Sequence, residues 1–204
     1  RSTLFPYTTL FRSQPLTAHA YGPRLMRKLI EFGITGMEHG SLMDEETAKL
    51  FEDSGTYLVP TFMPYEDIVH NDEESLAQKS PEYRNKLRFY QDRIRKGREI
   101  IVNSKIRLGY GTDMVSVHNN YESGWEYGAW MASGMDPFRI LHAATRVNAE
   151  ICEIADRVGT IEPGKLADIA GWRRNLLKDP DALRDCSFVM KEGRRYPAES
   201  HIDL

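Results

Sequence analysis

The sequence predicts an α/β fold built on a parallel sheet and followed by a short C-terminal β segment. Short apolar runs alternate with amphipathic stretches between residues 16 and 155. Glycine, proline and helix-capping residues stand at the boundaries between these stretches. Strands that alternate regularly with helices build parallel sheets. After Arg157 the pattern changes to brief apolar runs broken by glycine and proline, which predicts a few short strands.

The predicted parallel strands are short and mostly apolar. They cover residues 16–21 (LTAHAY), 34–39 (ITGMEH), 56–62 (TYLVPTF) and 107–112 (RLGYGT). Small residues such as Ala18 and Ala20 alternate with His19 in the first strand, so one face of the sheet can approach a helix closely.

The predicted helices have recognisable starts and stops. They cover residues 24–32, 45–53, 81–104, 122–133 and 137–155. Asp44 is a good N-cap for the second helix, and Gly55 suits its C-terminal end. Pro81 fits the first turn of the third helix.

Length and composition exclude several classes of protein. The chain has 204 residues, 41% of them hydrophobic, which is enough for a sizeable buried core. The 27 basic and 30 acidic side chains provide no cationic field for nucleic acid or an anionic membrane. No run approaches the roughly 18 apolar residues of a membrane span. The two cysteines, Cys152 and Cys186, are too few for a disulfide framework.

The first thirteen residues (RSTLFPYTTLFRS) are expected to be a non-native leader. They show neither helical nor strand periodicity, and they look like the conceptual translation of a sequencing-library adapter. A junction at Ser13 implies that the natural protein begins upstream and that its N-terminal part is missing here. We therefore expect three segments: residues 1–13, residues 14–156 and a C-terminal β segment over residues 157–204.

Three predicted strands end in residues that can carry chemistry. His19 lies near the end of the first strand and His39 at the end of the second, just before Gly40. Asp113 follows directly upon the fourth strand. Parallel α/β folds place their active groups at the carboxyl ends of strands, so these side chains are expected to converge.

Two imidazoles and a carboxylate form a ligand set that suits zinc, manganese or iron. Each residue alone is weak evidence, because a single histidine at a strand end is more often a hydrogen-bonded core group. The joint pattern at three strand ends favours a divalent metal site.

The ordered motifs resemble the C-terminal half of amidohydrolase-superfamily enzymes. The residues that carry the resemblance are HAYGP from His19, MEHG from Met37, GYGTD from Gly109, HAAT from His142 with Asn148 and Ala149, and VGTIEPGKLADI from Val158. Within the superfamily, the sequence is most similar to imidazolonepropionase-like and Xaa-Pro dipeptidase-like hydrolases.

This resemblance implies an incomplete (β/α)8 barrel in which the chain supplies strands five to eight. It implies that His19 and His39 bind a metal, most simply zinc, with one or two ions in the full-length protein. It also implies that Asp113 contacts a metal and accepts the proton of the attacking water. Tyr21 and His118 are the implied substrate-binding residues.

The implied reaction is hydrolysis of a carbon–nitrogen bond in a dipeptide of the Xaa-Pro type or in a cyclic amide. The HxH pair and the lysine that the family carries on earlier strands have no counterpart here. We therefore expect the isolated chain to be poorly stable, inactive, or both. Two alternatives stay open: a mononuclear deaminase on the same barrel, and a non-catalytic fragment or binding module.

The expected partner is a small molecule or dipeptide, not nucleic acid or membrane. We expect a cytoplasmic location, although a signal peptide in an upstream segment would change it. The sequence leaves the oligomeric state open, a homo-oligomer included.

Overall fold

The chain is a mixed α/β protein whose residues fall into two compact units. The computed structural model describes residues 15–70, 73–114 and 124–197, so the expected leader lies outside the described residues. The first unit ends at Leu108 and the second begins at Gly109. The first unit contains a parallel sheet and the second an antiparallel one.

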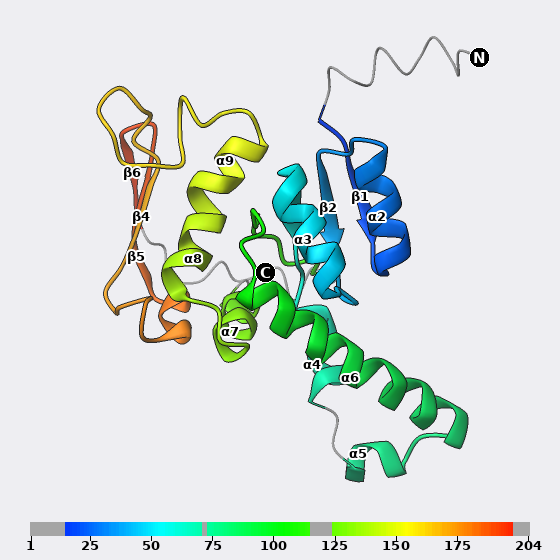
Figure 1. Ribbon diagram of the computed structural model, residues 1–204. Helices are drawn as coiled ribbons and strands as arrows, with labels where there is room; N and C mark the ends of the chain where they lie inside the picture. Colours follow the sequence, from blue (N-terminus) through cyan, green and yellow to red (C-terminus); the bar gives the residue numbers. More distant parts are fainter. Residues whose placement is uncertain (1–14, 71–72, 115–123, 198–204) are drawn as a thin grey trace, which may run out of the picture. The chain divides into compact units, whose positions relative to one another are not determined.

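The parallel sheet has the order β1-β2-β3 (Figure 1). Its strands are β1 (Thr17–Ala20), β2 (Gly36–His39) and β3 (Tyr57–Val59). In the register of β1 against β2, His19 lies beside Glu38 and Ala20 beside His39. The expected parallel pairing is thus confirmed, with strands shorter than the apolar runs that predicted them.

Two helices connect these strands, α2 (Pro23–Glu31) and α3 (Glu45–Ser54). The Asp44 carboxylate accepts a hydrogen bond from the backbone N–H of Thr47 at 2.8 Å, which satisfies a donor of the first turn of α3. Gly55 ends α3 with a φ of 72°, a left-handed conformation that glycine adopts without a steric penalty. Both predicted caps are confirmed.

The core of the first unit lies between the sheet and its helices. Its fully buried side chains include Ala20, Met26, Met37, Phe51 and Leu58. Ala20 and Met37 come from one face of the sheet, the face on which small and apolar residues were expected. Each large apolar side chain buried in this way contributes about 1.5–3 kcal/mol.

A helical segment follows β3. It consists of η1 (Met63–Tyr65), α4 (Glu66–Val69), α5 (Glu73–Ala77) and the long α6 (Pro81–Asn103). Ser80 caps α6 by accepting a hydrogen bond from the Tyr83 N–H at 3.3 Å, and Pro81 occupies the first turn as predicted. Figure 1 shows α4 packed alongside α6, and α5 lies between them in the sequence.

The expected fourth strand over residues 107–112 is wrong in its extent. Within the described residues, this segment forms a single parallel bridge, between Leu108 and Leu58 of β3. Gly109 and Gly111 lack the side chains that stabilise a strand by packing, which explains why the pairing stops there.

The described helices of the second unit start at Gly124. They are α7 (Gly124–Ala132), α8 (Pro137–His142) and α9 (Asn148–Ile151), with a π-helical turn at Ala143–Val147 between the last two. The predicted continuous helix over residues 137–155 is therefore interrupted by the π turn and ends earlier. Trp130, Tyr127 and Ile140 are fully or almost fully buried in this unit.

The C-terminal strands form an antiparallel sheet of order β4-β5-β6 (Figure 1). They are β4 (Ile169–Trp172), β5 (Cys186–Lys191) and β6 (Arg194–Tyr196), and a short 3-10 helix (Pro180–Arg184) precedes β5. The expectation of a few short strands after Arg157 is confirmed. Among the helices of the described residues, none combines the length and apolar character needed to cross a bilayer.

Candidate metal-binding site

The two predicted histidines meet at the carboxyl ends of neighbouring parallel strands. His19 Nδ1 and His39 Nε2 are 2.7 Å apart, and the ring centroids are separated by 4.9 Å. His39 is 3% exposed, whereas His19 is exposed. The pair thus has one ring fixed in the protein and one ring open to solvent.

An unusual backbone conformation explains how His39 reaches His19. The Thr17 hydroxyl donates a hydrogen bond to the Glu38 carboxylate at 2.7 Å, so Glu38 shares a face with Thr17 and, by alternation, with His19. In a regular strand His39 would point to the opposite face. His39 instead has a φ of 74°, outside the strand region, and its ring lies against His19. Non-glycine residues held in this conformation cluster at functional sites.

A hydroxyl group anchors the second nitrogen of His39. Nδ1 of His39 lies 2.8 Å from Oγ1 of Thr61, which is 4% exposed and stands two residues beyond β3. When Nδ1 carries the proton and donates it to Thr61, the lone pair of His39 is on Nε2 and points toward His19. A hydrogen bond to the other ring nitrogen is the usual way in which proteins orient a metal-binding histidine.

Tyr21 stacks on His39. The two rings are almost parallel, with centroids 4.7 Å apart and an interplanar angle of 5°. Tyr21 is 46% exposed, so part of the side chain remains accessible beside the histidine pair. The structure thereby brings together His19, Tyr21 and His39, three of the five predicted site residues.

The histidine pair fits a divalent metal. Two nitrogen ligands of a tetrahedral zinc ion, each about 2.0–2.1 Å from the metal, are about 3.3 Å apart. The observed 2.7 Å between His19 Nδ1 and His39 Nε2 becomes that distance after a shift of a few tenths of an ångström in each ring. Across the residues that the structure describes, no cluster of three or more His, Cys, Asp or Glu side chains is placed to hold an ion. A zinc ion takes about four ligands, so other residues or water would have to supply the ligands beyond this histidine pair.

Asp113 belongs to the second unit, where it is exposed and has a φ of 50°. The segment before it is held by Asn148 of α9. The Asn148 amide donates to the Tyr110 carbonyl and accepts from the Tyr110 N–H, both at 2.9 Å. Burial, together with the nearby Glu126 carboxylate, raises the pKa of the Tyr110 phenol. The contribution of Asp113 to the metal site stays a prediction, and His118 lies outside the described residues.

Sequence reasoning missed Thr61. The sequence placed Thr61 inside the predicted strand over residues 56–62, whereas β3 ends at Val59 and Thr61 follows it. Its role depends on a hydrogen bond across 22 residues of sequence, which no local pattern reports.

Comparison with known proteins gives the family. The model of the amidohydrolase family matches residues 11–195. A search of the curated proteins found no match.

Among solved structures, an amidohydrolase is 30% identical with a TM-score of 0.75, covering 94% of this chain and 46% of that one. A Xaa-Pro dipeptidase with methionine bound in its active site is 28% identical with a TM-score of 0.77, covering 93% of this chain and 46% of that one. A prolidase complexed with N-methylphosphonate-L-proline is 27% identical with a TM-score of 0.71, covering 92% of this chain and 46% of that one.

The chain spans about half the length of these solved structures, since it covers 46% of each. The family match, by contrast, extends over residues 11–195 and includes both histidines of the pair. The chain belongs to the amidohydrolase family.

Proposed function

We propose that this chain forms strands five to eight of a (β/α)8 barrel in a metal-dependent hydrolase that cleaves carbon–nitrogen bonds. Residues 14–156 would form the barrel part and residues 157–204 the β segment of a smaller domain. The observation that carries the proposal is the pair of histidine nitrogens 2.7 Å apart at adjacent strand ends, with Thr61 anchoring the buried ring. In barrel enzymes, active sites lie at this end of the strands.

His19 Nδ1 and His39 Nε2 are the atoms that would hold the metal, and imidazole donors suit zinc. A bound divalent cation lowers the pKa of a water molecule and polarises the scissile carbonyl. Asp113 would accept the proton of the attacking water and pass it to the leaving amine, so that an amide and water become a carboxylate and an amine.

The proposed substrate is a dipeptide of the Xaa-Pro type or a cyclic amide. Two of the similar structures support this class: one is a Xaa-Pro dipeptidase, and the other is a prolidase complexed with N-methylphosphonate-L-proline. Tyr21 leaves 46% of its surface accessible beside His39, and its phenol would donate a hydrogen bond to a substrate carboxylate or carbonyl oxygen. His118, five residues after Asp113 in the sequence, would contact the substrate.

Metal binding by the chain tests the histidine pair. We expect Co²⁺ to bind the 204-residue chain and give a visible absorption spectrum, and we expect His19→Ala and His39→Ala to lose it. His142→Ala is the matched control, because it removes an exposed histidine from a helix of the second unit. Binding that survives both His19→Ala and His39→Ala would contradict the proposed ligands.

Activity is tested on the protein expressed in its full genomic reading frame. We expect that protein to contain zinc or manganese by elemental analysis and to release proline from Xaa-Pro dipeptides. The 204-residue chain alone is expected to show no turnover. A longer protein that purifies without metal, and that neither zinc nor manganese activates, would refute the hydrolase and favour a non-catalytic module.

A further inference from the structure

Thr61 fixes the rotation of the buried imidazole of His39. Its hydroxyl is 2.8 Å from Nδ1, and both residues are almost fully buried, at 4% and 3% exposure. Only Nε2 of this ring faces His19. The orientation of the nitrogen that would bind metal therefore depends on where the backbone places Thr61.

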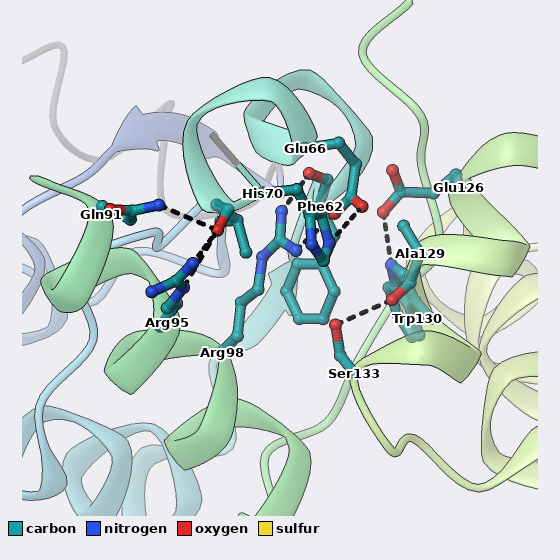
Figure 2. A network of polar contacts seen from close by, with 11 residues as sticks. Phe62, Glu66, His70, Gln91, Arg95, Arg98, Glu126, Ala129, Trp130 and Ser133 are labelled. Carbon is teal, nitrogen blue, oxygen red and sulfur yellow. Dashed lines mark hydrogen bonds and ion pairs between the residues drawn. The ribbon is translucent and has the colours of Figure 1, made fainter. Parts of the chain in front are cut away.

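Arg98 of α6 holds the turn that carries Thr61. Its Nη2 donates to the backbone carbonyl of Phe62, the residue after Thr61, and its Nη1 donates to the carboxylate of Glu66 (Figure 2). The guanidinium also lies 4.8 Å from the centre of the Phe62 ring. Arg98 is 5% exposed, so this charge is buried; its Nη groups pair with Phe62 in the turn after β3 and with Glu66 at the start of α4.

Gly97, the preceding residue of α6, touches the loop after β2. A Cβ at this position would lie 2.4 Å from the carbonyl oxygen of Ser41 and 3.0 Å from the backbone nitrogen of Met43. Ser41 and Met43 lie two and four residues after His39, in the loop that follows Gly40. The helix therefore packs backbone against backbone on this loop, and a side chain at position 97 would push the two apart.

Further contacts tie the end of α4 to the same helix. Arg95 and Gln91 of α6 both donate to the carbonyl of Val69, the last residue of α4 (Figure 2). Arg95 thus resembles Arg98 in type and in helix, but it is exposed, and the carbonyl that it binds lies eight residues beyond Thr61, whereas Arg98 binds the residue after Thr61. This difference provides a matched control.

We propose that α6 is a brace for the candidate metal site, and that Thr61, Gly97 and Arg98 are positioning residues for His39. Gly97 contacts the loop after β2, which follows His39 in the chain. Arg98 contacts the turn after β3, which carries Thr61, the hydrogen-bond partner of His39 Nδ1. The inference rests on the proposed function, because it assumes that His39 Nε2 is a metal ligand.

The first test compares Thr61→Val with Thr61→Ser in the full 204-residue chain. Serine keeps a hydroxyl near Nδ1, whereas valine removes it at almost the same volume. We expect Thr61→Val to weaken Co²⁺ binding by about 10–100-fold and Thr61→Ser to bind nearly as tightly as wild type. A second readout needs no metal: the ¹⁵N shifts of the His39 ring at alkaline pH should show a proton on Nδ1 in wild type and a mixture of tautomers in Thr61→Val.

The second test compares Arg98→Met with Arg95→Met. We expect weaker Co²⁺ binding and a mixture of His39 tautomers in Arg98→Met, with both readouts unchanged in Arg95→Met. Should Arg98→Met fail to give a folded chain by circular dichroism, Gly97→Ala takes its place, and the same two changes are expected.

The outcomes separate this inference from the proposed function. Loss of Co²⁺ binding in His39→Ala, together with wild-type affinity and tautomer in Thr61→Val, overturns the brace and leaves the proposed ligand intact. Wild-type Co²⁺ binding in His39→Ala overturns the proposed ligand, whatever the Thr61 variants do. Equal effects of Arg98→Met and Arg95→Met overturn the specific role of Arg98.

Discussion

Replacing Asn148 by alanine should release the segment that leads to Asp113. Asn148 begins α9 directly after the π-helical turn, and its amide makes two hydrogen bonds to the backbone of Tyr110, each 2.9 Å long. Tyr110 lies between two glycines, three residues before Asp113. The side chain of Asn148 therefore supplies a constraint that the glycine-rich segment cannot provide for itself.

The expected cost follows from these two bonds. Each contributes about 0.5–1.5 kcal/mol, and the backbone groups left behind at Tyr110 are half-buried, which adds to the loss. Alanine recovers up to about 0.7 kcal/mol as the better helix former. The free energy of unfolding of the second unit should therefore fall by about 1–2 kcal/mol.

Hydrogen exchange and urea unfolding measure this loss. We expect the Tyr110 amide to exchange about 5–30 times faster in Asn148→Ala, the factor that corresponds to the expected free energy. Asn103→Ala is the control, because its exposed amide bonds to the Glu99 carbonyl one turn earlier in the same helix. If the Tyr110 amide exchanges at the wild-type rate while the chain stays folded, the Asn148 bonds do not hold this segment and the reasoning fails.

Two further predictions concern buried aromatic rings. Folding raises the pKa of Tyr110 above its ordinary value of about 10, so above this pH the folded state keeps a proton that the unfolded state loses. The free energy of unfolding should therefore fall as the pH rises above about 10. Tyr110→Phe should reduce this pH dependence in urea titrations at alkaline pH, and an unchanged pH dependence would contradict the assignment. Gly36→Ala should destabilise the first unit by about 1–3 kcal/mol, because its Cβ would lie 2.1 Å from the buried ring of Tyr57. Thermal unfolding checks this against Gly22→Ala, whose Cβ meets open space, and equal stability of the two variants would show that the ring yields freely.

Local sequence determined where helices begin and end. Asp44 caps α3 through a bond to a residue three positions away, and Gly55 ends the same helix through its own backbone freedom. Ser80 and Pro81 start α6 in the same local way. These signals can be recognised in the sequence because the capping residue and the backbone group that it caps lie within one helical turn of each other.

The alternation of strands and helices likewise predicted the parallel sheet, and with it the meeting of His19 and His39. Register places equivalent ends of parallel strands side by side, so two histidines at successive strand ends were expected to be neighbours. The pattern could not predict the backbone conformation of His39. Its φ of 74° depends on the loops and side chains around it, and period-two reasoning alone would have sent its ring to the other face.

Only the tertiary structure decided which groups support the candidate site. Thr61 meets His39 across 22 residues and Arg98 meets Phe62 across 36, and neither distance leaves a periodic trace in the sequence. The extent of the expected strand over residues 107–112 was also decided by the tertiary structure: within the described residues it has one bridge, at Leu108, and Gly109 and Gly111 offer no side chains to extend the pairing. Sequence by itself predicted the caps of α3, the start of α6 and the parallel pairing that brings His19 and His39 together, since these follow from contacts within a few residues and from the geometry of parallel strands. The orientation of the imidazole rings followed from hydrogen bonds and packing between distant segments, which exist only once the chain has folded.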